Sequence, residues 1–213
     1  MSESSVEAAR YALLRRLAPA IRHRVVGKLH PIGLIAEAVE WQMQEATPDL
    51  KSARESAGRI NSLSRSAMLS FTGQITWLAR EEGATTSISD GIADCLGLLH
   101  TDFELRGFAV TSTVEPCDQK VSLNALRNVL TAALIAITDA ALPPANLVLS
   151  LELSGTQALL TIVSQPVEKE LSGFEHSDAY RRLEWKDVQA LAAAESVELS
   201  RSGERVQMRY EIK

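Results

Sequence analysis

Residues 23–34 read HRVVGKLHPIGL and lie within the longest amphipathic pattern of the chain. Around this stretch, apolar residues recur at spacings of three and four, which is typical of a helix with one apolar face. The members of this apolar stripe are Leu14, Leu17, Ile21, Val25, Leu29, Ile32, Ile35, Val39 and Met43. His23 lies two positions from both Ile21 and Val25, so at about 100° per residue it points away from the stripe. The sequence therefore predicts a long helix that carries a solvent-exposed histidine.

The residues one helical turn from His23 have short side chains. They are Pro19, Ala20, Val26 and Gly27. Positions three and four apart are neighbours on a helix surface, so no long side chain is expected to cover the imidazole ring. An exposed imidazole can act as a nucleophile. His30 lies seven residues further on, on nearly the same face, and is a second candidate for this chemistry.

Composition limits the classes of function. The chain has 213 residues, 46% of them hydrophobic, and a formal net charge of −5, which does not indicate a basic nucleic-acid-binding surface. No apolar run approaches the ~20 residues of a membrane span, and the polar start does not resemble a signal peptide, so we expect a soluble, cytoplasmic protein without membrane association. Cys95 and Cys117 are isolated, which favours reduced structural thiols and no metal site.

A second helix is predicted from Leu50 to about Leu78, after a break at residues 46–49 where Thr47 or Asp49 can cap it. Its expected inward face is mostly small: Ala53, Ala57, Ile60, Leu63, Ala67 and Phe71. Two long helices joined by a short turn form a hairpin, which alone leaves one apolar side uncovered. We therefore expect residues 1–80 to form a helical hairpin that pairs with a second copy in a dimeric four-helix bundle.

Residues 84–213 alternate between helical and strand patterns. The expected elements are a helix at 87–106, a strand at 108–114, a helix at 122–142, a hairpin of strands at 147–153 and 158–163, a helix at 184–195, and a hairpin of strands at 197–201 and 206–212. This order describes an α/β sandwich with one layer of helices on a mixed sheet. The whole chain is thus predicted to be an α+β protein of two domains.

Two segments resemble motifs of bacterial sensor histidine kinases and histidine phosphotransferases. Around His23 the sequence is similar to the phosphoacceptor box H-R-V-x-N-x-L of kinases and to H-D-x-x-N-K-L-x-x-I of the sporulation-type phosphotransferases of Bacillus, with Gly27 in place of the asparagine. Residues 126–133, LRNVLTAA, are similar to the kinase N-box helix L-x-N-L-L-x-N-A. The resemblance implies a phosphotransfer hairpin followed by an ATPase-type domain.

The second domain departs from the kinase pattern where kinases bind ATP. The second N-box asparagine, which is the magnesium ligand of the family, is replaced by Ala132. Residues 162–167, IVSQPV, contain neither the acid for the adenine amino group nor a glycine, and the lid region from Glu168 to Leu183 contains only Gly173. We therefore expect an ATPase-like domain that binds no nucleotide and needs no cofactor of its own.

The resemblance implies a histidine phosphotransferase in which His23 relays a phosphoryl group between receiver domains, with magnesium supplied by the receiver. Arg24 and Lys28 flank the site as contacts for an acidic receiver pocket. The expected docking residues are Pro19, Ala20, Arg24, Val26, Gly27, Lys28 and His30. Two alternatives stay open: a catalytically inactive dimeric interaction module, and a divergent ATP-dependent histidine kinase.

Overall fold

The computed structural model describes residues 2–75, 77, 81–167 and 181–213, and the chain forms two compact units. Unit 1 comprises Met1–Ala18 and Glu81–Lys213, and unit 2 comprises Pro19–Arg80. This division differs from the boundary at residue 80 expected from sequence, because the first 18 residues pack with the C-terminal part of the chain. Among the described residues, no helix has the length and apolar character needed to cross a membrane.

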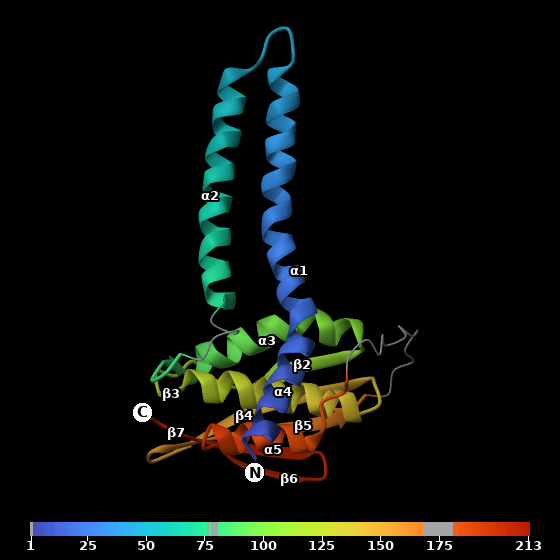
Figure 1. The fold of residues 1–213 in the computed structure, drawn as a ribbon, viewed down its shortest axis with the longest axis vertical. Coiled ribbons are helices and arrows are strands. Elements are labelled where there is room, and N and C mark those ends of the chain that lie inside the picture. Colours follow the sequence, from blue (N-terminus) through green and yellow to red (C-terminus); the bar gives the residue numbers. More distant parts are fainter. Residues whose placement is uncertain (1, 76, 78–80, 168–180) are drawn as a thin grey trace. The chain divides into compact units, whose positions relative to one another are not determined.

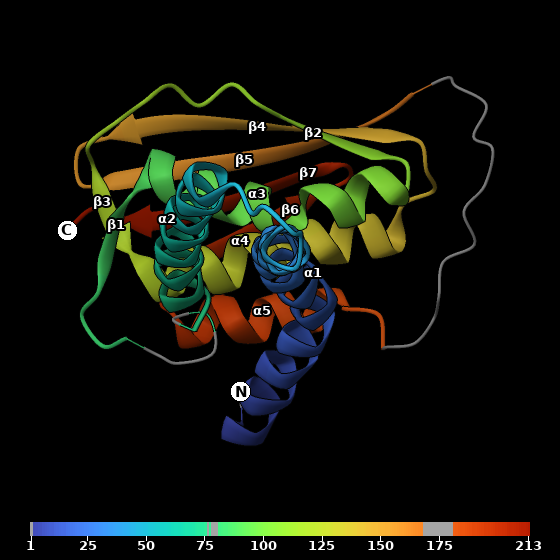
Figure 2. The ribbon, with the colours of Figure 1, turned by 90° about the horizontal axis from the view of Figure 1, so that it is seen from above.

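Unit 2 is a pair of helices, α1 and α2. Helix α1 spans Glu3–Met43, runs through Pro19 and Pro31 without interruption, and contributes its part beyond Ala18 to this unit. Helix α2 spans Leu50–Ile75 and lies beside α1 in Figures 1 and 2. The Asp49 carboxylate begins α2 by accepting the backbone N–H groups of residues 51 and 52 at 3.0 and 3.1 Å. Both long helices and the cap were predicted from sequence.

Unit 1 contains a five-stranded sheet in the order β2-β4-β5-β7-β6. Its strands are β2 (Phe108–Ser112), β4 (Ala145–Ser154), β5 (Gln157–Pro166), β6 (Glu198–Ser202) and β7 (Arg205–Glu211). Strands β2 and β4 are parallel and the other pairs are antiparallel, so the sheet is mixed as expected. A separate antiparallel pair, β1 (Thr85–Ser87) with β3 (Lys120–Ser122), was not predicted, because three-residue strands leave no periodic pattern.

In the part of unit 1 that the structure describes, three helices cover one face of this sheet: α3 (Ile88–Leu105), α4 (Leu123–Ala140) and α5 (Trp185–Ala194), as Figure 2 shows. The Ser87 and Ser122 hydroxyls cap α3 and α4 by accepting backbone N–H groups three residues on, at 3.1 and 3.3 Å. Gly107 ends α3 with a φ of +79°, a conformation that favours glycine. The predicted layer of helices on a mixed sheet is confirmed, and the start of α1 adds a helix outside this layer.

The core of unit 1 lies between the sheet and α4. Leucines spaced four apart on α4 (Leu126, Leu130 and Leu134) are fully buried, as are Leu147, Leu149, Leu160 and Ile162 of the sheet. Every residue of α4 from 129 to 138 is buried, so the helix is enclosed on all sides. A central helix of this kind needs a cover on the side away from the sheet as well.

A buried ionic cluster ties the start of α1 into unit 1. Asp139, near the end of α4, accepts hydrogen bonds from Arg16 of α1 at 2.5 and 2.7 Å and from Arg106 at 2.8 Å. Its carboxylate also accepts the backbone N–H of Leu183 at 3.0 Å. The side chains of Asp139, Arg16 and Arg106 are 2%, 10% and 8% exposed. We call these groups the Asp139 cluster.

Replacing Asp139 by asparagine should lower the free energy of unfolding by about 3–5 kcal/mol, because it leaves two buried guanidinium groups without their carboxylate. Urea denaturation followed by circular dichroism measures this change. Asp102→Asn is a matched control, since Asp102 pairs with the same Arg106 but its side chain is 46% exposed. The control should cost about 0–1 kcal/mol. Equal effects of the two substitutions would contradict a structural role for the Asp139 cluster.

Candidate functional site

His23 lies on the part of α1 that belongs to unit 2, and its side chain is exposed to solvent. Among the described residues, its ring has no hydrogen-bond or ion-pair partner. The opposite side of the helix carries Ile21 and Val25, which are half-buried. The predicted orientation of His23, away from the apolar stripe, is therefore what the structure shows.

The residues predicted to surround His23 lie on the same stretch of helix. Pro19, Val26, Gly27, Lys28 and His30 are exposed, and Ala20 and Arg24 are half-buried. A Cβ built on Gly27 would meet no atom within 4 Å, so this position opens directly to solvent. Val26 is 56% exposed and adds apolar surface beside the histidine. The site is an accessible imidazole flanked by short side chains and by cations.

Positive charge accompanies this surface. From residue 8 to residue 36 the chain contains no Asp or Glu, and this range includes Arg22, Arg24 and Lys28. Residues 56–75 of α2 also lack acids and carry Arg59 and Arg65. The acidic residues of unit 2 that flank the turn at 44–49 are Glu37, Glu40, Glu45, Asp49 and Glu55. We call residues 19–36 and 56–75 together the acid-free hairpin surface.

Helix α2 adds exposed apolar side chains that the sequence analysis did not assign to the site. Met68 and Leu69 are 69% and 78% exposed. Because α2 returns beside α1 after the turn at 44–49, its second half lies toward the same end of the hairpin as His23, as Figure 1 shows. The sequence does contain a signal for this exposed apolar surface. Met68 and Leu69 are adjacent, so they cannot both face inward on one helix.

In unit 1, Asn128, which resembles the first N-box asparagine of kinases, is hydrogen-bonded within the protein. The Asn128 amide donates a hydrogen bond to Glu195 Oε1 at 3.1 Å, and Arg10 Nη2 lies 3.3 Å from the same oxygen. Ala132 is fully buried. Strand β5 ends at Pro166, and Gly173 of the lid region lies outside the described residues.

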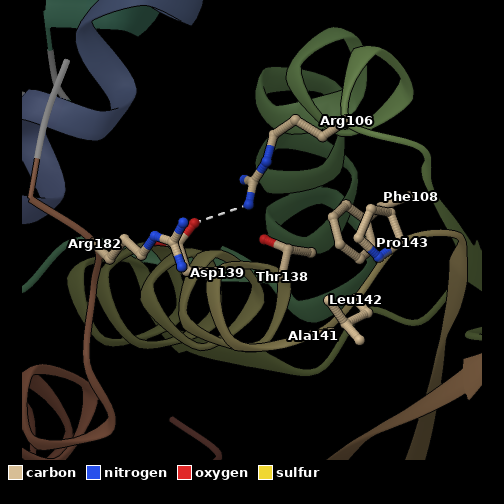
Figure 3. Close-up of a pocket in the computed structure, with 8 residues that line it drawn as sticks. All are labelled: Arg106, Phe108, Thr138, Asp139, Ala141, Leu142, Pro143 and Arg182. Atoms are coloured by element: carbon tan, nitrogen blue, oxygen red, sulfur yellow. Dashed lines mark hydrogen bonds and ion pairs between the residues drawn. The ribbon is translucent and has the colours of Figure 1, made fainter. Parts of the chain in front are cut away.

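A pocket of about 190 Å³ lies beside the Asp139 cluster, and Figure 3 shows it. Its wall combines Phe108 and Pro143 with the guanidinium groups of Arg106 and Arg182. The charge of Arg106 is already neutralised by Asp139. Among the described residues, no group of three His, Cys, Asp or Glu side chains could hold a metal ion. No pattern in the sequence indicated this pocket.

No protein-family model and no curated protein matches the chain. In a comparison of structures, the chain is similar to solved structures of histidine kinases. A histidine kinase from Burkholderia phymatum STM815 has a TM-score of 0.46 and 13% identity over 100% of this chain and 99% of that one. AdeS of Acinetobacter baumannii has a TM-score of 0.45 and 13% identity, covering 90% and 97%. The catalytic domain of ThkA has a TM-score of 0.47 and 11% identity, covering 62% and 95%.

His23→Ala should change the free energy of unfolding by no more than about 0.5 kcal/mol, because the ring is exposed and its removal leaves no cavity. Leu17→Ala on the same helix is the contrasting variant, since Leu17 is 1% exposed and should cost about 2–5 kcal/mol. Urea denaturation of both variants tests the placement of the two side chains. If His23→Ala destabilises the protein as much as Leu17→Ala, the histidine is buried.

Proposed function

We propose that this chain is a histidine-containing phosphotransferase that relays a phosphoryl group between receiver domains through His23, without binding ATP. The observation that carries the proposal is an exposed, unpartnered histidine on the acid-free hairpin surface, within the described part of the chain. The resemblance of residues 23–34 to a phosphoacceptor box supports the same assignment. His30, also exposed and on nearly the same face, is the competing acceptor.

The chemistry requires little from the protein besides an accessible nucleophile. An unprotonated imidazole nitrogen of His23 attacks the phosphorus of a receiver aspartyl phosphate, a P–N bond forms, and the P–O bond to the aspartate breaks. The electron pair of that bond returns to the receiver carboxylate. A second receiver carboxylate then attacks phosphohistidine in the reverse sense. Magnesium held by the receiver neutralises the phosphoryl oxygens, so this chain supplies position and access.

The surroundings of His23 suit an acidic partner with an apolar rim. Receiver phosphorylation sites hold carboxylates and a metal ion, and the acid-free hairpin surface offers Arg22, Arg24 and Lys28 without competing acids. Val26, Met68 and Leu69 provide exposed apolar area. The open space at Gly27 leaves room for a partner helix to approach the ring.

Three features of unit 1 support a protein that takes no phosphoryl group from ATP. Position 132 has an alanine that can ligate no metal, and the end of β5 carries Gln165 and Pro166 instead of an acid and glycines. The Asn128 amide is occupied by Glu195. Losing all these contacts together would remove most of the polar recognition that a nucleotide needs.

We further propose a homodimer through the two helices of unit 2. The hairpin leaves large apolar side chains exposed in the single chain, among them Leu29, Leu50 and Ile75. Two hairpins that pair as a four-helix bundle would cover the face that carries Leu29, opposite His23. This arrangement would leave the histidine surface free for a receiver.

The phosphoryl donor and the acceptor histidine can be tested together. Receiver domains from the same genome, labelled with radioactive acetyl phosphate, should transfer label to the wild-type chain, whereas His23→Ala should accept none. His30→Ala should retain most of the transfer, because that ring only borders the docking face. Label taken directly from ATP would indicate a divergent kinase instead, and no label from any receiver would indicate an inactive interaction module.

Bulk beside the histidine should block the partner without unfolding the protein. Gly27→Arg should reduce transfer at least tenfold, because the new side chain enters the open space next to His23. Gly33→Arg is the matched control, since it adds the same charge and volume at another open, exposed helical position. Transfer rates of the two variants under identical receiver concentrations measure the difference. If Gly27→Arg transfers at the wild-type rate, receivers dock elsewhere.

Multi-angle light scattering at micromolar concentration should give twice the mass of one chain, 46.4 kDa from 2 × 23.2 kDa. Leu29→Glu should yield monomers, because it places a charge within the proposed bundle. Leu105→Glu serves as the control, since Leu105 is 57% exposed at the end of α3 in unit 1. A monomeric wild-type chain would rule out the dimer.

A further inference from the structure

The outer stripe of α4 comprises the residues on its side away from the sheet: Asn128, Ala132, Ile135 and Asp139. Spacings of four, seven and eleven place these four residues on one face of the helix. Leu126, Leu130 and Leu134 lie on the opposite side and are fully buried. The outer stripe therefore faces away from the sheet and would be open to solvent in a two-layer fold.

The outer stripe is nevertheless covered. Ala132 and Ile135 are 0% and 1% exposed. Figures 1 and 2 both place the N-terminal part of α1 over α4 and α5, on the side away from the sheet. Four apolar side chains of that part are buried: Ala9, Ala12, Leu13 and Leu17. We call residues 3–17 the N-terminal strap.

Polar contacts hold the N-terminal strap at both ends of the outer stripe. At one end, Glu195 Oε1 accepts hydrogen bonds from Asn128 Nδ2 at 3.1 Å and from Arg10 Nη2 at 3.3 Å. At the other end, Arg16 forms two hydrogen bonds with Asp139. Arg10 and Arg16 are six residues apart on α1. Their two contacts therefore fix both the position of the strap along α4 and its distance from α4.

We propose that the N-terminal strap is a built-in occupant of the outer face of α4, and that it closes this face to ligands and partners while the Arg10 and Arg16 contacts hold. The face contains Asn128 and Ala132, the positions that resemble the kinase N-box, so the strap covers the surface that this resemblance assigns to nucleotide binding. This inference goes beyond phosphoryl transfer through His23 and does not depend on it. It gives Asn128 a structural partner in place of a ligand.

Two kinds of contact hold the strap in unit 1. Its four apolar side chains, Ala9, Ala12, Leu13 and Leu17, are buried, and charged pairs fix its two ends. The strap is the N-terminal end of the 41-residue helix α1, and helix ends that lose their packing open more easily than helix interiors. Release should therefore expose Ala132 and unprotect the strap amides without opening the core.

A cysteine substituted for Ala132 reports whether the face is closed. The test protein is the full chain with Ala132→Cys and Cys117→Ser, which removes the half-buried natural thiol. Cys95 stays as an internal control for global unfolding, since it is fully buried. Burial also raises the pKa of its thiol well above the usual range, which keeps it unreactive. The probe is a maleimide reagent.

We expect the introduced thiol to react at least tenfold faster when Arg10→Gln and Arg16→Gln are added, while Cys95 stays unreacted. Arg15→Gln is the matched control, because Arg15 is exposed on the same helix and lies over Tyr11 at 5.8 Å. This control should leave the rate unchanged. In the native cysteine background, the same double variant should speed amide exchange of residues 5–17 and leave residues 123–140 protected.

Three results would overturn the proposal. Rapid labelling of the introduced thiol without the arginine substitutions would mean that the face is open. An unchanged rate in the double variant would mean that other groups cover it. Parallel acceleration at the introduced thiol and at Cys95 would mean that the strap is part of the global fold and not a separable cover. If the Ala132→Cys variant does not fold, the amide-exchange comparison alone decides between these outcomes.

Discussion

The buried carboxylate of Asp139 determines how the chain is divided. A carboxylate that is 2% exposed must be neutralised, and its partners Arg16 and Arg106 come from two segments of unit 1 that the hairpin separates in sequence. Arg106 follows α3, whereas Arg16 lies on α1, 123 residues before Asp139. One buried charge therefore holds the N-terminal turns of α1 to the domain that follows the hairpin. Together with the buried Ala9, Ala12, Leu13 and Leu17, this contact joins the first segment of the discontinuous unit to the second.

Helix α1 carries two different surfaces as a consequence. Its first four turns bury Ala9, Leu13 and Leu17, so they are part of a core. The turns after Pro19 bury no side chain fully, and they display His23 and several cations. The proposed phosphotransfer needs an accessible imidazole, whereas stability of the α4 layer needs a cover. The same helix can meet both demands because the two surfaces lie at different positions along it.

Periodicity in the sequence predicted the elements of unit 1 well, since long helices and paired strands leave strong patterns. It also oriented His23, because that argument depends only on the positions of Ile21 and Val25. Periodicity did not predict that the first 18 residues belong to unit 1. The apolar stripe was read from Leu14 onward, and the buried face that contains Ala9 and Leu13 was not recognised. The contact between Arg16 and Asp139 spans 123 residues, and no local pattern in one sequence encodes such a pairing.

Net charge was also a misleading guide to the candidate site. The chain carries −5, yet the acid-free hairpin surface has only cations, because the acids gather near the turn and in unit 1. Charges act mainly within a Debye length of about 8–10 Å in physiological salt. A partner that approaches His23 therefore experiences Arg22, Arg24 and Lys28 more strongly than the acids around the turn at 44–49. A protein that is acidic as a whole can therefore attract an acidic partner locally. The positions of the charged residues along α1 and α2 determine where this attraction acts.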